Sequence, residues 1–363
     1  MNSSFFKIFS RTRDNSYFVA IILLLGLSFL HCTGGNDPDN EALPKFGIYM
    51  PVDTTITYEK LQTMNLDTVR IKKWLTDDMI DYYDYSSHLI YLKVDKLSFF
   101  PESQWPLLGF SHYHAFWQQK RIPFIILGEA VRIYAGVFTH NRTFQKPTPY
   151  ISGREASSVA DDVIKIALYD IELSNTEYNL AKDVRSSSQI GEALKSAGIF
   201  SGGIEFKIDD VKIIGGDTLE VSATVKNNDR NNLYIFNLKN TNIITSKPLP
   251  TVILVKKDQL SGYKYYFNNI ISSGFTGASD EYFRLEKGKS INLKFIAVSP
   301  QNAISNDYFL YCDFHGESYQ FNQDKRIKSD GRVWMGKTRS NYMDITYDST
   351  TGITIKNKDY KFE

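Results

Sequence analysis

The histidines are the first residues in this chain whose type and spacing could do chemistry. On a β-strand, the side chains of His112 and His114 would share one face and could bind Zn²⁺ together. A zinc site needs a third protein ligand, and none follows at a recognised spacing. His88 stands directly after a turn, where its ring is expected to fix the turn by hydrogen bonding. We therefore expect structural roles for all three histidines and no bound metal.

Pairs of adjacent carboxylates are the next candidates, because glycoside hydrolases use two carboxylates about 5–10 Å apart. The pairs are Asp77-Asp78, Asp161-Asp162 and Asp209-Asp210. Neighbouring side chains point in different directions, and each pair stands where a cap or a turn explains it. Residues 227–232, NNDRNN, lack the spaced carboxylates of a calcium loop and predict a plain turn between strands. The sequence also has no phosphate-loop, G-x-S-x-G or Cys-x-x-Cys motif, so we expect no catalytic residue and no cofactor.

Aromatic side chains are the strongest sign of a binding surface. They are dense in residues 82–91, 112–117 and 134–138. Because side chains alternate along a strand, not all of them can enter one core. Exposed Tyr and Trp serve both protein and sugar partners. We therefore expect an exposed apolar patch that binds a partner, with partial burial at a domain interface as the alternative. Its candidate residues are Tyr85, Tyr91, Trp117 and Tyr134.

The elements that position these residues follow an N-terminal export signal. Lys7, Arg11 and Arg13 precede an apolar run at residues 18–30, and Cys32 follows. A basic head, a short apolar core and a small polar exit are typical of a secretory signal peptide. As a helix this run would reach about 20 Å, which is too short for a hydrocarbon core of about 30 Å. We therefore predict that residues 1–31 are a cleaved signal peptide.

Cys32 resembles the cysteine of the bacterial lipoprotein lipobox, which is acylated and becomes the first residue of the mature protein. The sequence departs from that pattern at residues 29–31, FLH, where a small residue usually precedes the cysteine. The resemblance implies a lipid-anchored protein of the bacterial cell envelope. Thr33 after the cysteine favours the outer membrane over the inner. An uncleaved anchor and a secreted protein without lipid are the alternatives.

The charge balance excludes one class of partner. The chain has 42 basic and 41 acidic side chains, and 39 and 40 remain without those of the signal peptide. A nucleic-acid binder needs a basic face that neutralises phosphates, so we expect no nucleic-acid partner. If Cys32 carries lipid, Cys312 has no partner for an intramolecular disulfide, and stability must come from packed cores.

The length of 363 residues exceeds what a single core usually organises, so two domains are expected. Residues 32–44, CTGGNDPDNEALP, predict a flexible tether. Residues 45–200 predict an α+β domain, and residues 203–363 predict an Ig-like antiparallel β-sandwich. A hinge is expected at residues 201–203, Ser-Gly-Gly.

Short strands and helices are expected to alternate in the first domain. Strands are predicted at residues 45–50, 66–73, 88–93, 150–151 and 162–173, with a β-hairpin that joins 121–127 to 131–138. Helices are predicted at residues 76–83, 111–119 and 186–194. Thr76 is the expected N-cap of the first helix, and Gly198 is the expected glycine after the last.

Three stretches within residues 76–198 have the features of a known family. Residues 123–138, PFIILGEAVRIYAGVF, come before a Pro-Tyr-Ile strand; residues 83–90 are YDYSSHLI, and Asp183-x-Arg185 precedes a short helix. These stretches resemble uncharacterised bacterial secreted proteins with an NGE.IYLGAF hairpin and a Tyr-Asp-Trp-x-x-His-x-Ile motif. Ala130 and Val131 are extra here, and Ala135 replaces the usual Leu. That family has no activity we can name, so the resemblance implies a domain and no function.

Residues 204–363 give the pattern of the second domain. Short alternating segments are separated by Gly, Asn and Asp turns, which is typical of an antiparallel sandwich. Residues 285–290, LEKGKS, resemble the entry into a late strand of bacterial Ig-like modules. Leu310, Cys312 and Phe314 share one face of a strand, so Cys312 is expected to fill a core. Residues 342–347 and 353–356 predict a further hairpin.

These observations favour a non-catalytic, envelope-anchored lipoprotein that binds a protein or glycan partner. The alternative is an envelope hydrolase that acts on glycan or peptide through acids scattered in the sequence and gathered in space.

Overall fold

The computed structural model describes residues 44–93, 121–139, 148–151, 163–169, 183–215, 218–236, 250–257, 264–266, 268–273, 282–298, 305–316, 327–348 and 350–361. All of them belong to one of the two units into which the chain divides, Pro44–Glu363. The predicted signal peptide, Cys32, the helix at residues 111–119 and the two neighbouring histidines lie outside the described residues. Within the described ranges, no helix has both the length and the apolar character needed to cross a membrane.

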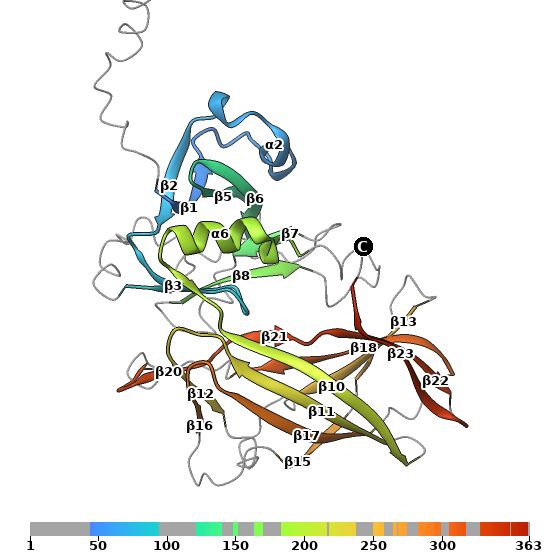
Figure 1. The fold of residues 1–363 in the computed structure, drawn as a ribbon. Coiled ribbons are helices and arrows are strands. Elements are labelled where there is room, and N and C mark those ends of the chain that lie inside the picture. The colour runs from blue at the N-terminus through green and yellow to red at the C-terminus, as the bar shows by residue number, and fades with distance from the viewer. Residues whose placement is uncertain are drawn as a thin grey trace, which may run out of the picture. The chain divides into compact units, whose positions relative to one another are not determined.

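A nine-stranded sheet, with strand order β2-β1-β5-β6-β7-β8-β4-β3-β9, dominates the N-terminal half (Figure 1). Its strands are β1 (Phe46–Pro51), β2 (Ile71–Thr76), β3 (Ile80–Asp84), β4 (Leu89–Leu92), β5 (Ile122–Gly128), β6 (Val131–Phe138), β7 (Thr148–Ile151), β8 (Val163–Tyr169) and β9 (Phe200–Ser201). The helical segments are α2 (Tyr58–Thr63), η1 (Leu66–Thr68), η4 (Val184–Ser186) and α6 (Ser188–Ser196). Helix α6 covers the sheet with an apolar face that buries Ile190, Ala193 and Leu194.

The predicted β5–β6 hairpin is confirmed. The two strands pair antiparallel from Ile122 and Phe138 to Gly128 and Val131. A two-residue hairpin turn of type I′ needs positive φ at both positions, which Asn-Gly supplies most easily. Here Glu129 and Ala130 adopt φ values of 49° and 67°. The turn therefore stores backbone strain that a glycine would relieve.

The helix expected at residues 76–83 is wrong. Thr76 ends β2, and a tight turn leads directly into β3, with the Met79 amide donating to the Thr76 carbonyl at 2.9 Å. The Thr76 hydroxyl donates to the Asp78 carboxylate, so these acids make a turn rather than a first helical turn. The strand expected at residues 66–73 begins only at Ile71, after the 3₁₀-turn η1.

The described residues of the C-terminal half form three sheets. The first has the order β10-β11-β17-β15, the second β16-β12-β20-β19 and the third β14-β13-β18-β22-β23, with β21 paired to β18. Their strands are β10 (Ile204–Gly215), β11 (Thr218–Asn227), β12 (Asn232–Phe236), β13 (Thr251–Lys256), β14 (Lys264–Tyr266), β15 (Asn268–Ser273), β16 (Tyr282–Leu285), β17 (Ser290–Val298), β18 (Asn306–His315), β19 (Ile327–Lys328), β20 (Gly331–Val333), β21 (Lys337–Arg339), β22 (Tyr342–Asp348) and β23 (Gly352–Tyr360).

One core joins the first and third of these sheets. Alternate residues of β11 and β17, such as Val221 and Phe295, meet alternate residues of β18, such as Leu310. This is the packing of a β-sandwich, in which each strand contributes every second side chain. Cys312 is fully buried in this core, as predicted, and burial raises the pKa of its thiol well above the ordinary value. The hairpin predicted near the C-terminus is confirmed as β22–β23.

The protein is mainly β, with a few short helices and several sheets. One large core lies within residues 46–200 and another within residues 204–355. A smaller cluster contains side chains from both halves, Tyr82 and Tyr91 with Val333 and Met335. The boundary between the two predicted domains stays a prediction.

Residues 201–203, where a hinge is expected, are closely packed in the structure. Ser201 is 1% exposed and belongs to β9, and Gly203 has a φ of 62°. A Cβ on Gly203 would lie 2.1 Å from Asp84 Oδ1 and 2.2 Å from the Ser86 hydroxyl oxygen. The glycine is therefore required for close packing against residues 84–88.

Candidate functional site

The turn of residues 84–88 between β3 and β4, called the junction turn below, makes buried polar contacts with the C-terminal half. Asp84 Oδ1 accepts hydrogen bonds from the Ser86 amide at 3.1 Å and the Ser86 hydroxyl at 2.7 Å, which closes an Asx-type turn. The chain then enters β4 through His88, which has a φ of 56°. The turn therefore presents Asp84 to one side and His88 to the other.

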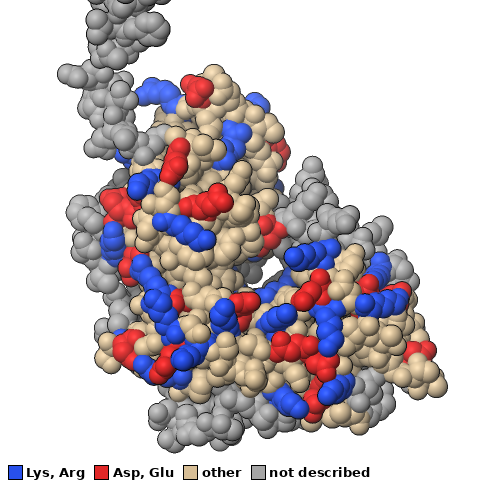
Figure 2. All heavy atoms as spheres, in the orientation of Figure 1, with Lys and Arg blue, Asp and Glu red and all other residues tan. Residues whose placement is uncertain are grey.

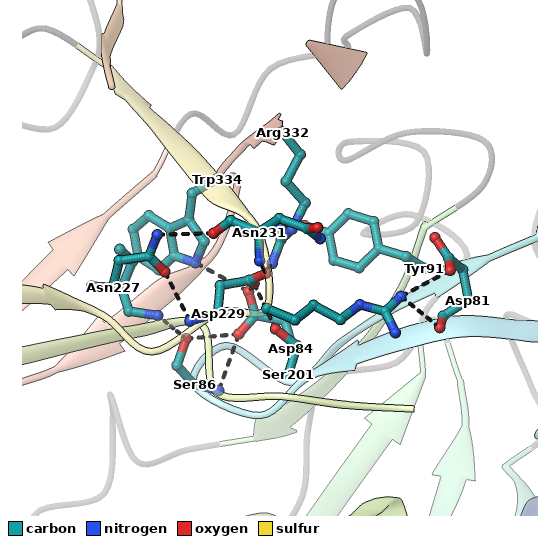
Figure 3. Close-up of polar contacts among 12 residues, drawn as sticks. Asp81, Asp84, Ser86, Tyr91, Ser201, Asn227, Asp229, Asn231, Arg332 and Trp334 are labelled. Carbon is teal, nitrogen blue, oxygen red and sulfur yellow. Dashed lines mark hydrogen bonds and ion pairs between the residues drawn. The ribbon is translucent and has the colours of Figure 1, made fainter. Parts of the chain in front are cut away.

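Arg332 of β20 reaches Asp84 from the C-terminal half (Figure 3). Its Nη2 lies 3.2 Å from Asp84 Oδ2 and 2.5 Å from Asp229 Oδ2. The side chains of both aspartates are fully buried, and that of Arg332 is 4% exposed. The Trp334 indole N–H also donates to Asp84 Oδ2, at 3.1 Å. The Asp84 carboxylate thus attaches the junction turn to Arg332 and Trp334, which are 248 and 250 residues away in the sequence.

Asp229 is held in place by the turn of residues 227–232 that precedes β12. Its Oδ1 accepts from the Asn231 amide at 2.9 Å, and its own amide donates to Asn227 Oδ1 at 2.8 Å. The Ser201 hydroxyl donates to Asp229 Oδ2 at 2.6 Å. The predicted inter-strand turn is confirmed, and it also carries the second carboxylate that faces Arg332.

Two tyrosine rings complete the surroundings of Arg332. Its Cζ lies 4.6 Å from the ring centroids of both Tyr82 and Tyr91, and its Nη1 donates to the Tyr91 hydroxyl at 3.0 Å. Burial alone would lower the pKa of Arg332, but the neighbouring Tyr82, Tyr91 and the two aspartates raise it well above the ordinary value. The guanidinium is therefore a permanent cation at any working pH.

The convergence of Asp84 and Asp229 is a structural clamp. Both carboxylates lie within hydrogen-bond distance of one nitrogen, so they are as close together as the acids of a glycoside hydrolase. A substrate cannot reach them, because neither has exposed surface. Buried charges persist where a partner and hydrogen bonds compensate for lost hydration, and both conditions hold here.

His88 occupies the other side of the junction turn. Its Nδ1 lies 3.2 Å from the Tyr83 hydroxyl, and its Nε2 lies 3.3 Å from the Ser186 hydroxyl and 3.8 Å from Asp183 Oδ2. Burial, and then the nearby Arg185, lower the pKa of His88 to about 3 against the opposing effect of Asp183. The imidazole is neutral at pH 7, and it stabilises the turn as the sequence predicts.

Asp183 and Arg185 form the ion pair beside His88. Arg185 Nε donates to Asp183 Oδ1 at 2.9 Å, Nη2 donates to Oδ2 at 2.6 Å, and Nη1 donates to the Ile166 carbonyl at 2.8 Å. Burial alone would raise the pKa of Asp183, but Arg185 outweighs it and holds the pKa well below the ordinary range. This bidentate pair ties η4 to β8 and fixes the start of α6.

Ser186, His88 and Asp183 do not have the geometry of a catalytic triad. A triad places the nucleophile and the carboxylate on opposite nitrogens of the imidazole. Here Ser186 and Asp183 both approach Nε2, and Tyr83 takes Nδ1. A histidine whose pKa is about 3 is also a weak base at neutral pH.

The exposed aromatic patch expected from the sequence is wrong for two of its residues. Tyr91 is 1% exposed and Tyr134 is 6% exposed, so both belong to buried clusters. Tyr85 is half-buried, and its hydroxyl donates to the Ser187 carbonyl at 3.1 Å. Trp117 lies outside the described residues. Burial between the halves, the alternative expectation, describes Tyr91, which meets Val333 and Met335.

The roles of Arg332, Trp334 and Asp229 were not predictable from the sequence. No local pattern marks Arg332, because its partners are 103 and 248 residues away. The sequence marks only the junction turn, because Asp84 and His88 belong to the YDYSSHLI stretch that carries the family resemblance. It does not mark their partners in the C-terminal half. Among the described residues, no group of three His, Cys, Asp or Glu side chains could hold a metal ion.

No family model matches the chain, and no curated protein matches it. Solved structures give distant likenesses. An uncharacterized β-sandwich protein from Clostridium difficile 630 is 14% identical, with a TM-score of 0.19, over 37% of this chain and 84% of that one. AvmM, which catalyzes macrocyclization in alchivemycin A biosynthesis, is 11% identical, with a TM-score of 0.20, over 39% of this chain and 85% of that one. At such TM-scores neither likeness carries an argument, and no family is identified.

Proposed function

We propose that this protein is a non-catalytic lipoprotein of the bacterial cell envelope that binds a protein or glycan partner. Cys32 carries the lipid, and residues 32–44 form the tether. Residues 45–200 are an α+β domain, and residues 203–363 are an Ig-like β-sandwich domain. The protein is anchored in the outer membrane rather than the inner.

The directions of the pKa shifts at the junction turn support the proposal that the protein is non-catalytic. Acid–base catalysis at neutral pH needs groups with a pKa near 7. The pKa of His88 is lowered to about 3, that of Asp183 is lowered, and those of Arg185 and Arg332 are raised. Each group therefore keeps one charge state at pH 7, which suits a structural role better than proton transfer.

The attachment of the two halves supports a binding role. The clamp of Arg332 with Asp84 and Asp229 lies where the chain passes from one half to the other, and Gly203 packs directly against it. Two halves joined in this way present their surfaces in a fixed arrangement, which lowers the entropic cost of binding a partner.

Two measurements test this function. The full-length protein should partition into the detergent phase of envelope fractions, and Cys32→Ala should move it to the soluble phase, with Cys312→Ala as the matched control. Capture from detergent-solubilised envelopes should recover a partner in a saturable amount. A Cys32→Ala variant that partitions like wild type contradicts the anchor, and the absence of any saturable partner contradicts the binding role.

A hydrolase is the second candidate, and the contact of Ser186 with His88 at 3.3 Å is the observation that favours it. A serine nucleophile would react with a fluorophosphonate probe. The proposed function predicts no labelling of the native protein. Labelling that disappears in Ser186→Ala and persists in Ser188→Ala would establish the hydrolase instead.

A further inference from the structure

Asp330-Gly331 is the only Asp-Gly pair in the chain, and no Asn-Gly pair occurs. In such a pair the backbone nitrogen of the glycine can approach the carboxyl group of the aspartate closely, because glycine has no Cβ to shield it. The two residues lie where the β19–β20 hairpin turns back, and Gly331 begins β20. The Asp330 side chain is 40% exposed, so water reaches it. The pair therefore has the sequence and the exposure of a site where the main chain can rearrange.

The rearrangement proceeds through a cyclic imide, a succinimide. The Gly331 nitrogen forms a bond to Asp330 Cγ, one Cγ–O bond breaks, and the hydroxyl group leaves as water together with the amide proton. Water then opens the ring at either carbonyl. Opening at Cγ restores aspartate, whereas opening at the backbone carbonyl gives isoaspartate, in which the main chain runs through Cβ. The leaving oxygen must carry a proton, so a carboxylate that stays ionised reacts slowly.

Three donors hold the Asp330 carboxylate in its ionised form. The Tyr234 hydroxyl donates to Oδ1 at 2.6 Å, Arg284 Nε donates to Oδ2 at 2.8 Å, and Asn232 Nδ2 donates to Oδ2 at 3.2 Å. The hydrogen bond from Tyr234, and then that from Arg284, lower the pKa of Asp330. These contacts therefore oppose the protonation that ring closure needs.

The main chain at this pair is also held in place. Asn232 Nδ2 donates to the Asp330 carbonyl at 3.0 Å, and Gly331 pairs with Asn232 of β12. A Cβ on Gly331 would lie 2.2 Å from the Asn232 carbonyl oxygen, so the glycine is in close contact with β12. Ring closure requires rotation about the backbone bonds of Asp330, which these contacts resist. The folded chain should therefore rearrange more slowly than the unfolded chain.

The position of the pair links this chemistry to the clamp. Arg332 is two residues beyond Asp330 on the same short strand, and its Nη2 contacts the buried carboxylates of Asp84 and Asp229. Isoaspartate adds one carbon to the main chain, a lengthening of about 1.5 Å. This extra atom changes the register of β20 against β12. The buried guanidinium cannot then keep the contacts that it makes in the unmodified chain.

We propose that Asp330-Gly331 is a modification site at which isoaspartate forms through a succinimide. The contacts of Tyr234 and Arg284 keep this reaction slow in the folded protein. Isoaspartate at position 330 releases Arg332 from its contacts with the two buried aspartates. The modification needs no enzyme or cofactor, because water is the only co-reactant. It is independent of the proposed function, since it depends only on residues around β20.

Peptide mapping of the aged full-length protein in detergent tests the proposal. Mass spectrometry distinguishes isoaspartate from aspartate by fragmentation and detects the succinimide as the loss of one water. Folded wild type should accumulate isoaspartate at position 330 slowly, and wild type unfolded in urea should accumulate it faster. Arg284→Met and Tyr234→Phe should each raise the rate in the folded protein about tenfold, the value of one hydrogen bond to a charged group.

Lys358→Met is the matched control, because Lys358 makes an exposed ion pair with a different aspartate, Asp210, at 2.9 Å. Figure 2 shows acidic and basic side chains interspersed over the visible face of the molecule. Removing one surface cation therefore creates no large field of one sign, and the variants differ mainly in which aspartate loses its partner. Lys358→Met should form isoaspartate at position 330 at the wild-type rate.

A second measurement tests the link to the clamp. The isomerised fraction of aged Arg284→Met, separated by ion exchange, should unfold at a lower urea concentration than the unmodified fraction of the same variant. Equal midpoints of the two fractions would overturn this link. Equal rates in Arg284→Met, Tyr234→Phe and Lys358→Met would overturn the protection by Tyr234 and Arg284. If even unfolded wild type forms no isoaspartate at position 330, the modification site itself is wrong.

Discussion

Replacing Arg332 with methionine should strongly destabilise the protein. The substitution keeps the volume of the side chain and removes the only cation that contacts both Asp84 and Asp229 among the described residues. Both carboxylates have 0% exposed side-chain surface, so solvent cannot replace the lost partner. Removing one member of a buried ion cluster typically costs about 3–5 kcal/mol. We expect a loss of this size in the free energy of unfolding at pH 7.

Urea unfolding followed by tryptophan fluorescence measures this effect, because Trp334 donates to Asp84 and lies in the core. Arg284→Met is the matched control, since Arg284 also contacts two acids, Asp330 and Glu286, but is 40% exposed. Exposed ion pairs contribute little to stability. Equal unfolding of the two variants would refute the clamp.

Further substitutions probe strain, packing and protonation. Ala130→Gly should stabilise the protein by about 1 kcal/mol in urea unfolding, because Ala130 has a φ of 67°, and an unchanged midpoint would contradict the strain. Gly203→Ala should lower the melting temperature strongly, because the added Cβ would lie 2.1 Å from Asp84 Oδ1; a normal melting curve would show that the junction can shift. The depressed pKa of His88, about 3 against about 6.5 unfolded, means that wild type loses stability as pH falls from about 6.5 to about 3. His88→Gln should reduce that slope by up to about 1.4 kcal/mol per pH unit, and an identical slope in both proteins would disprove a buried neutral His88.

Local patterns sufficed for part of the fold. The β5–β6 hairpin, α6 and the β22–β23 hairpin depend on contacts between near neighbours in sequence, and all three were predictable. The helix expected at residues 76–83 failed because Thr76 and the acids after it suit a tight turn as well as a helix start. The choice between a tight turn and a helix depends on the pairing of β2 and β3 with other strands of the sheet.

The candidate site was far less predictable than the elements. Asp84 and His88 lie in one short stretch, but what they do depends on Arg332 and Asp229, which approach from other sheets. The density of aromatic residues also led to the prediction that Tyr91 is exposed, whereas the structure buries it. The rings of Tyr82 and Tyr91 flank a buried guanidinium instead of a partner, and periodicity cannot reveal such a distant cation.

The polar residues of the junction turn should join the two halves into one cooperative unit. Differential scanning calorimetry of the full-length protein in detergent tests it most directly. We predict one unfolding transition for wild type and for Arg284→Met, and two resolved transitions for Arg332→Met, because its remaining contacts between the halves no longer include the ion cluster that couples the two large cores. Two transitions in wild type, or a single unshifted transition in Arg332→Met, would contradict the claim.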